Sequence, residues 1–143
     1  MMLEFAMRNG DIMRLKRDNF VERDGRVFLN YTPHKTEHSS GRVVKWPVHP
    51  SIWAQMHTLF NGDDLPELDE AVFDELNAAM RGMGFTGTKG AYELRKICVD
   101  HVYQKFGAEM AVSISGDDIR TIMHYYADPA QPNIDNIRVT DLI

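Results

Sequence analysis

Strict alternation between apolar and polar residues is confined to one stretch of this chain, residues 19–48. The alternation is interrupted at Asp24-Gly25, a dipeptide typical of a tight hairpin turn. A polar loop, PHKTEHSSG, then separates the second strand pattern from a third, RVVKWPV, which Pro47 is expected to close because proline cannot donate to a sheet ladder. The stretch therefore predicts a three-stranded antiparallel meander, with Lys35 in its second turn.

Helical periodicity and helix-end signals dominate on both sides of this meander. The expected helices cover residues 2–17 (where Asn9-Gly10 could interrupt the helix), 50–60, 69–84, 91–106, 108–114 and 117–127. Asp69 is expected to cap its helix, and Gly84 and Gly107 to end theirs. The predicted fold class is α+β: mostly helical, with a three-stranded antiparallel sheet near the N-terminus.

Length and apolar content predict one domain. The chain has 143 residues, 43% of them apolar, which is enough for one core but short for two. No apolar run approaches the ~20 residues of a membrane span, and the first residues lack the pattern of a signal peptide. We therefore expect a soluble, cytoplasmic protein. The single cysteine, Cys98, lies between apolar neighbours and is expected in the core.

Net charge argues against one large class of functions, since 16 basic against 21 acidic residues give −5, whereas a DNA-binding module is usually basic. The charges are unevenly distributed, however. Residues 63–75 are strongly acidic, and segment 8–45 is locally basic. Its basic residues are Arg8, Arg14, Lys16, Arg17, Arg23, Arg26, Lys35, Arg42 and Lys45. This asymmetry would let one face approach phosphate while another repels it.

Four separated segments carry residues suited to phosphodiester chemistry. In chain order they are FAMRNGDIMRLKRDNF, HKT, YELRK and ISGDDIRTIMHYYADP, and together they run from Phe5 to Asp128. Each has an ordinary alternative explanation when taken alone. In this order and at this spacing they resemble the signature of the tyrosine recombinase or phage integrase family, specifically its C-terminal catalytic domain.

The resemblance assigns the two phosphate-holding arginines to Arg8 and Arg95. A guanidinium is planar and always charged, so it can contact two phosphate oxygens and stabilise a pentacoordinate transition state. Asp11 matches the acidic residue that supports the site; alone, Arg8 and Asp11 would pass for a surface i,i+3 pair. Tyr92 replaces the histidine of the family's His-x-x-Arg box, where it can donate a hydrogen bond or simply pack as an aromatic residue.

The same resemblance places the family's catalytic lysine at Lys35, in the turn between the second and third strands. An ammonium there can protonate the leaving 5′ oxygen, although a lone lysine in a loop is more often only solvated. Asp117 stands where histidine or tryptophan is usual, and an ionised carboxylate beside phosphate would be unfavourable. The nucleophile falls on Tyr126, or on Tyr125 if the alignment slips by one residue; a plain aromatic pair at a helix end is the ordinary alternative.

The resemblance implies site-specific recombination, in which DNA is cleaved and rejoined through a 3′-phosphotyrosine without a cofactor. It also implies double-stranded DNA as partner, association with the nucleoid, and tetramers formed through the C-terminal tail, whose apolar residues could equally cover the chain's own core. We expect residues 1–143 to form a single catalytic domain, N-terminally shortened and without the family's core-binding domain. The altered positions 92 and 117 favour an alternative, a catalytically weakened or inactive DNA-binding or interaction remnant of the same fold. A separate alternative is a coincidental match, with the residues scattered in space.

The six histidines suggest no metal site, since none forms an i,i+4 pair with a carboxylate partner. We expect them in surface or loop roles.

Overall fold

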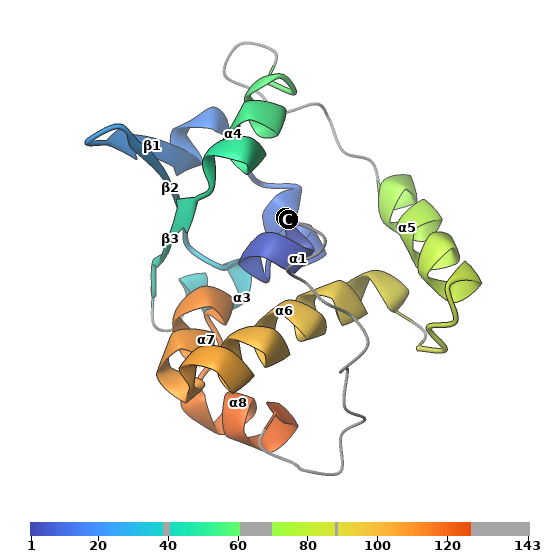
Figure 1. The fold of residues 1–143 in the computed structure, drawn as a ribbon. Coiled ribbons are helices and arrows are strands. Elements are labelled where there is room, and N and C mark those ends of the chain that lie inside the picture. Colours follow the sequence, from blue (N-terminus) through green and yellow to red (C-terminus); the bar gives the residue numbers. More distant parts are fainter. Residues whose placement is uncertain (39–40, 61–69, 88, 127–143) are drawn as a thin grey trace.

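The computed structural model describes residues 1–38, 41–60, 70–87 and 89–126. A three-stranded sheet lies at one side of the molecule, and helices form the rest (Figure 1). In chain order the elements are α1 (Met2–Phe5), α2 (Asn9–Ile12), the 3₁₀ helix η1 (Arg17–Asn19), β1 (Phe20–Arg23), β2 (Arg26–Tyr31), α3 (His34–Glu37), β3 (Val44–Val48), α4 (Pro50–His57), α5 (Glu70–Gly82), α6 (Gly90–Phe106), α7 (Ala108–Ser115) and α8 (Ile119–Tyr126). The predicted fold class is confirmed.

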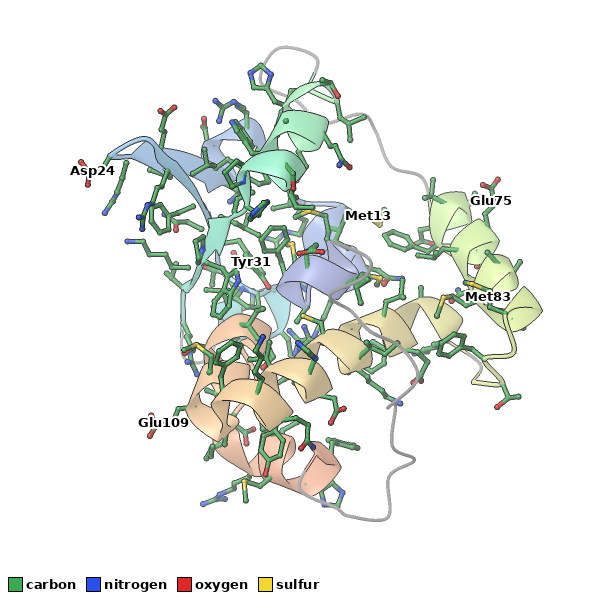
Figure 2. The ribbon with its side chains drawn as sticks, in the orientation of Figure 1. Met13, Asp24, Tyr31, Glu75, Met83 and Glu109 are labelled. Atoms are coloured by element: carbon green, nitrogen blue, oxygen red, sulfur yellow. The ribbon has the colours of Figure 1, made fainter. Side chains whose placement is uncertain are left out.

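The sheet is an antiparallel meander of order β1-β2-β3, as its sequence pattern predicts. Asp24 and Gly25 both have positive φ, 51° and 71°, as the favoured two-residue hairpin turn requires, and Figure 2 shows Asp24 at the far tip of this hairpin. The expectation that Pro47 closes the third strand is wrong, because Pro47 lies inside β3, opposite Phe28. The edge position of β3 explains this, since an edge strand tolerates a residue without an N–H.

The N-terminal segment departs from the expected single helix. The chain breaks at Ala6, which has φ 50° and is completely buried, rather than at Asn9-Gly10, and Gly10 lies inside α2. A left-handed alanine costs about 1–2 kcal/mol, which the burial of the segment on both sides of it must offset. As a consequence Arg8 stands in an extended linker between α1 and α2, with φ −83° and ψ 154°.

Helix α6 runs through the middle of the helical part, and α1, α5 and α7 pack against it (Figure 1). Its apolar face buries Ile97, Cys98 and Val102, as periodicity predicts. At its first turn a Cβ on Gly90 would lie 2.7 Å from Met80 Cβ, so only glycine allows α5 this close. These contacts hold α6 in place on both sides of Arg95.

Positive-φ glycines end α6, as predicted for Gly107, and α7. Gly107 has φ 86° and Gly116 φ 67°. The last helix begins later than expected, at Ile119, so that Asp117 lies in the α7–α8 loop and Asp118 caps α8 by accepting the Thr121 N–H at 2.9 Å. The expected helix end at Ala127, like the expected cap at Asp69, lies outside the described residues.

Among the described residues, the buried side chains form two clusters, and the segment of α1 contributes Met2 and Phe5 to the first and Ala6 to the second. One cluster lies under the sheet and includes Phe5 and Leu29; the other includes Val99, Ile114 and Ile122, where α6, α7 and α8 meet. Within the described ranges, no helix is both long and apolar enough to cross a membrane.

Candidate active site

Arg8 and Arg95 meet at one carboxylate, that of Asp117. Arg8 Nη2 donates a hydrogen bond to Asp117 Oδ1, and Arg95 Nη2 donates to Asp117 Oδ2 at 2.6 Å. The two arginines come from the α1–α2 linker and the middle of α6, and the acid comes from the α7–α8 loop. Two segments distant in sequence therefore point guanidinium groups at one place, which a coincidental match does not predict.

The Arg95 side chain is only 1% exposed, which is unusual for an arginine. Its Nη2 also donates to the Ser115 carbonyl at 3.1 Å, but its Nη1 is buried and has no hydrogen-bond partner among the described residues. Arg8 Nη1 is likewise buried and unsatisfied. Buried N–H groups normally have an acceptor. The two guanidinium groups therefore retain donor capacity for further oxygen atoms.

Asp11 links Arg8 to α3, the short helix that carries Lys35. Its Oδ1 accepts the backbone N–H of His34 at 2.8 Å, and its Oδ2 lies 3.8 Å from Arg8 Nη1. The carboxylate is almost completely buried, with 3% of the side chain exposed. Asp11 thus holds the start of α3 next to Arg8, in keeping with the supporting role that the resemblance implies.

A cavity of about 400 Å³ opens beside this carboxylate. Its lining residues are Arg8, Lys35, Thr36, Arg42, Gly116, Asp117, Asp118 and Thr121. Lys35 therefore lies on the same cavity as Arg8, although it belongs to the short helix α3 and not to a simple turn. Arg42, just before β3, is a third cation on the lining that we did not single out from the sequence. The sequence signal that could have indicated Arg42 is its place in the same β2–β3 connection as Lys35.

Gly116 brings the α7–α8 loop against the sheet. A Cβ there would lie 2.9 Å from Pro33 Cγ and 3.2 Å from Val44 Cγ2, in addition to the positive φ. Asp117 follows at once, and its backbone N–H donates to Ser115 Oγ at 3.0 Å. The glycine of the fourth segment is thus required by close packing that holds Asp117 between the arginines.

Tyr92 is not among the residues that line the cavity. It lies one helical turn before Arg95, is 39% exposed, and has the Lys96 ammonium 5.9 Å from its ring centroid. Arg95 does not line the cavity either; it lies behind the lining and contacts it through Asp117. The spacing in YELRK therefore places the two residues on neighbouring turns, but among the described contacts only Arg95 reaches a cavity-lining side chain.

The tyrosine pair lies at the end of α8. Tyr125 follows the cavity-lining Thr121 by four residues and so lies on the same face of the helix; its ring is 52% exposed and packs edge-on against His124 at 4.9 Å. Tyr126 is the last residue of α8, and its side chain lies outside the described residues.

The charged groups at the centre of the site balance. Arg8 and Arg95 supply two positive charges, and Asp11 and Asp117 two negative ones. Tyr31 is buried nearby on β2 (Figure 2), where burial, with Asp11 as a smaller contribution, raises the pKa of its phenol. Tyr31 is therefore a neutral neighbour and not a further anion.

Two other groups bear on the chemistry. Burial raises the pKa of the Cys98 thiol to about 11, which makes it a poor nucleophile near neutral pH. Among the described side chains, no three His, Cys, Asp or Glu residues are grouped so that they could hold a metal ion.

Comparison with known proteins gives a structural likeness without a sequence match. No known family profile and no curated protein sequence matches the chain. The site-specific recombinase XerH bound to difH substrate, in its pre-cleavage complex, aligns with TM-score 0.66 and 16% identity over 91% of this chain and 42% of that one. The post-cleavage complex of XerH with a palindromic difH substrate aligns with TM-score 0.63 and 16% identity over 87% and 40%.

The fold is therefore that of a tyrosine recombinase catalytic domain. The chain spans about two fifths of the length of the solved recombinase chains that it matches.

Proposed function

We propose that this chain is a DNA strand-cleaving and rejoining domain of the tyrosine recombinase type. The observation that carries the proposal is the convergence of Arg8 and Arg95 on one two-oxygen acceptor, next to a cavity that also holds Lys35. Two guanidinium groups that share an acceptor can hold a phosphodiester and stabilise the charge that develops on its oxygens during attack. The recombinase fold supports the same assignment.

In the proposed reaction, a tyrosine hydroxyl oxygen attacks phosphorus, gives its proton to a water molecule and forms a 3′-phosphotyrosine. The 5′ oxygen leaves and takes a proton from the Lys35 ammonium. Attack by the 5′ hydroxyl reverses the step and rejoins the strand, so the bond energy is retained without a cofactor. The sequence motif favours Tyr126 as nucleophile, whereas the helix face shared with Thr121 supports Tyr125.

The remaining family positions have more limited roles in this proposal. Tyr92 is exposed one turn before Arg95 and can donate a hydrogen bond to DNA, but a phenol is a poorer proton acceptor than the histidine that the family carries at this position. Arg42, on the cavity lining, adds a cation for the DNA backbone next to the scissile phosphate.

Double-stranded DNA is the proposed partner, and the likeness to recombinases solved with their DNA substrates supports it. We propose further that working assemblies are tetramers on two DNA sites, associated with the nucleoid. The tail segment 134–143, which would mediate contacts between subunits, lies outside the described residues.

A nicked suicide substrate tests the proposal, because loss of the short strand beyond the nick prevents rejoining and traps the covalent intermediate. We expect a DNA–protein adduct that resists denaturant and disappears in Tyr126→Phe. Tyr103→Phe, on α6 in the second core cluster, is the matched control and should retain the adduct. Loss of the adduct only in Tyr125→Phe would assign the nucleophile to Tyr125. No adduct with any candidate site, together with normal folding, would contradict catalysis.

A second candidate function is DNA binding without cleavage. The observation that favours it is the Asp117 carboxylate between the two arginines, which lowers the net charge available to phosphate. This candidate predicts salt-dependent DNA binding that is unchanged in both tyrosine variants, with no adduct in either.

A further inference from the structure

Asp117 makes the contacts expected of a bound ligand. Its two carboxylate oxygens are shared between the two arginines, Oδ1 with Arg8 and Oδ2 with Arg95. The two non-bridging oxygens of a phosphodiester offer the same kind of anionic, two-oxygen acceptor to a pair of guanidinium groups. The chain itself therefore supplies an anion to the site that we propose for DNA phosphate.

Contact decides whether an external phosphate can bind beside this carboxylate or must displace it. The four central charges sum to zero, and the further charged residues of the cavity lining, Lys35, Arg42 and Asp118, add one positive charge, so the site can attract one monoanionic phosphodiester. The Nη2 donors of both arginines are already occupied by the Asp117 carboxylate, however, and a phosphate held by the same donors would lie against it. Like charges in contact at a poorly solvated site are costly, so displacement of Asp117 is favoured over addition beside it.

The surroundings of Asp117 allow such a replacement. Its side chain is 12% exposed and belongs to the lining of the 400 Å³ cavity, whereas Arg95 is buried and held by the Ser115 carbonyl. The carboxylate can therefore move toward the cavity while Arg95 stays in place. Within the described part of the chain, the buried Nη1 atoms of both arginines have no hydrogen-bond acceptor, so they are donors that Asp117 leaves unused.

We infer that Asp117 is an internal competitor for the phosphate site: its carboxylate occupies the pair of arginines until a phosphodiester displaces it. The ligand class rests on the proposed function; the competition itself rests on the Arg8–Asp117–Arg95 contacts. It follows that neutralising Asp117 strengthens anion binding even though the same substitution weakens the fold.

The experiment compares Asp117→Asn with Asp118→Asn. Both remove one negative charge from the same cavity lining, but the Asp118 carboxylate caps α8 through Thr121 and, among the contacts of the described residues, makes none with either arginine. Asparagine is a good helix cap, so the control should fold normally. Binding of inorganic phosphate and of dimethyl phosphate, a monoanionic diester, is measured by calorimetry and by the rise in melting temperature with ligand concentration.

We expect Asp117→Asn to bind dimethyl phosphate on the order of tenfold more tightly than the unmodified chain, and Asp118→Asn to stay within about twofold. The melting temperature of Asp117→Asn should start lower and rise more steeply with phosphate. Equal affinity of Asp117→Asn and the unmodified chain, or equal gains in both variants, would overturn the inference.

A measurement on the unmodified chain covers the case in which Asp117→Asn does not fold. In a phosphate titration followed by NMR, the side-chain carboxyl carbon of Asp117 should shift together with the guanidinium signals of Arg8 and Arg95, while that of Asp118 moves much less. Arginine signals that saturate while Asp117 stays unchanged would refute the displacement.

The two probes also separate this inference from the proposed function. Competition by Asp117 for inorganic phosphate but no binding of the diester would leave the inference standing and remove DNA as the ligand. Binding of the diester that does not depend on Asp117 would refute the inference and keep DNA as the proposed ligand.

Discussion

Two arginine-centred junctions hold this fold together, and their surroundings differ. In the arginine junction, formed by Arg8, Arg95 and Asp117, the guanidinium groups meet a carboxylate. In the aromatic junction, the Arg17 guanidinium carbon lies 4.8 Å from the ring centroid of Trp53 and 5.7 Å from that of Phe60. The first joins the α1–α2 linker and α6 to the α7–α8 loop, and the second joins η1 to α4 and the segment that follows it.

The difference in partners indicates which arginine is available to a ligand. Arg17 lies over aromatic rings and donates to the Phe20 carbonyl at 3.1 Å, partners that no ligand can replace without unfolding part of the chain. Arg95 faces a side-chain anion on a loop beside a cavity, and an anion of similar shape can take that place. Burial alone does not mark a functional arginine; an exchangeable partner does.

Arg95→Ala should have the largest effect on stability. It leaves Asp117 with one partner fewer and opens a cavity in the core, so we expect a loss of about 3–5 kcal/mol in the free energy of unfolding. Urea denaturation measures it. Arg14→Ala, which breaks the exposed pair with Glu37, is the control and should cost far less, because solvent screens an exposed ion pair. Similar losses in both variants would mean that the arginine junction does not differ from a surface ion pair.

Gly116→Ala should have the next largest effect, because the loop that carries Asp117 depends on this glycine. The new Cβ meets Pro33 at 2.9 Å and φ is 67°, which together should cost roughly 2–3 kcal/mol. Gly25→Ala has a similar φ of 71° but nothing within 4 Å, so it isolates the backbone cost of about 1–2 kcal/mol. Equal losses in the two variants would show that the close approach to Pro33 contributes nothing.

Arg17→Ala tests the aromatic junction. Loss of the contact with Trp53 and Phe60 should lower the free energy of unfolding by about 0.5–2 kcal/mol, and leave phosphate affinity unchanged. Thermal unfolding and calorimetry with dimethyl phosphate measure the two quantities. A clear fall in phosphate affinity in Arg17→Ala would show that the two junctions do not differ in their availability to a ligand.

Tyr31→Phe should have the smallest effect. The Tyr31 hydroxyl is buried and has no hydrogen-bond partner among the described residues, so its removal should change the free energy of unfolding by less than about 1 kcal/mol in either direction. Chemical denaturation measures this change. A loss of several kcal/mol would reveal a polar link between the sheet and the arginine junction.

Much of the fold was predictable because its signals are local. Asp24-Gly25 is a dipeptide that readily adopts the positive φ angles of a tight turn. The glycines at 107 and 116 end helices because they too adopt positive φ. Apolar residues at helical spacing predicted the buried face of α6. The break at Ala6 was not predictable, since alanine favours helix and only burial against distant residues holds it left-handed.

The sequence by itself determined the meander, the helix order and the residue types suited to phosphate: Arg8, Lys35 and Arg95 with a tyrosine pair after them. Only the tertiary structure decided that Arg8 and Arg95 share the Asp117 carboxylate, that Arg42 joins the cavity and that Tyr92 stays outside it. The physical reason is the distance along the chain over which each kind of interaction acts. Turn and helix preferences act over a few residues, whereas the partner of a buried charge depends on how segments far apart in the chain pack together.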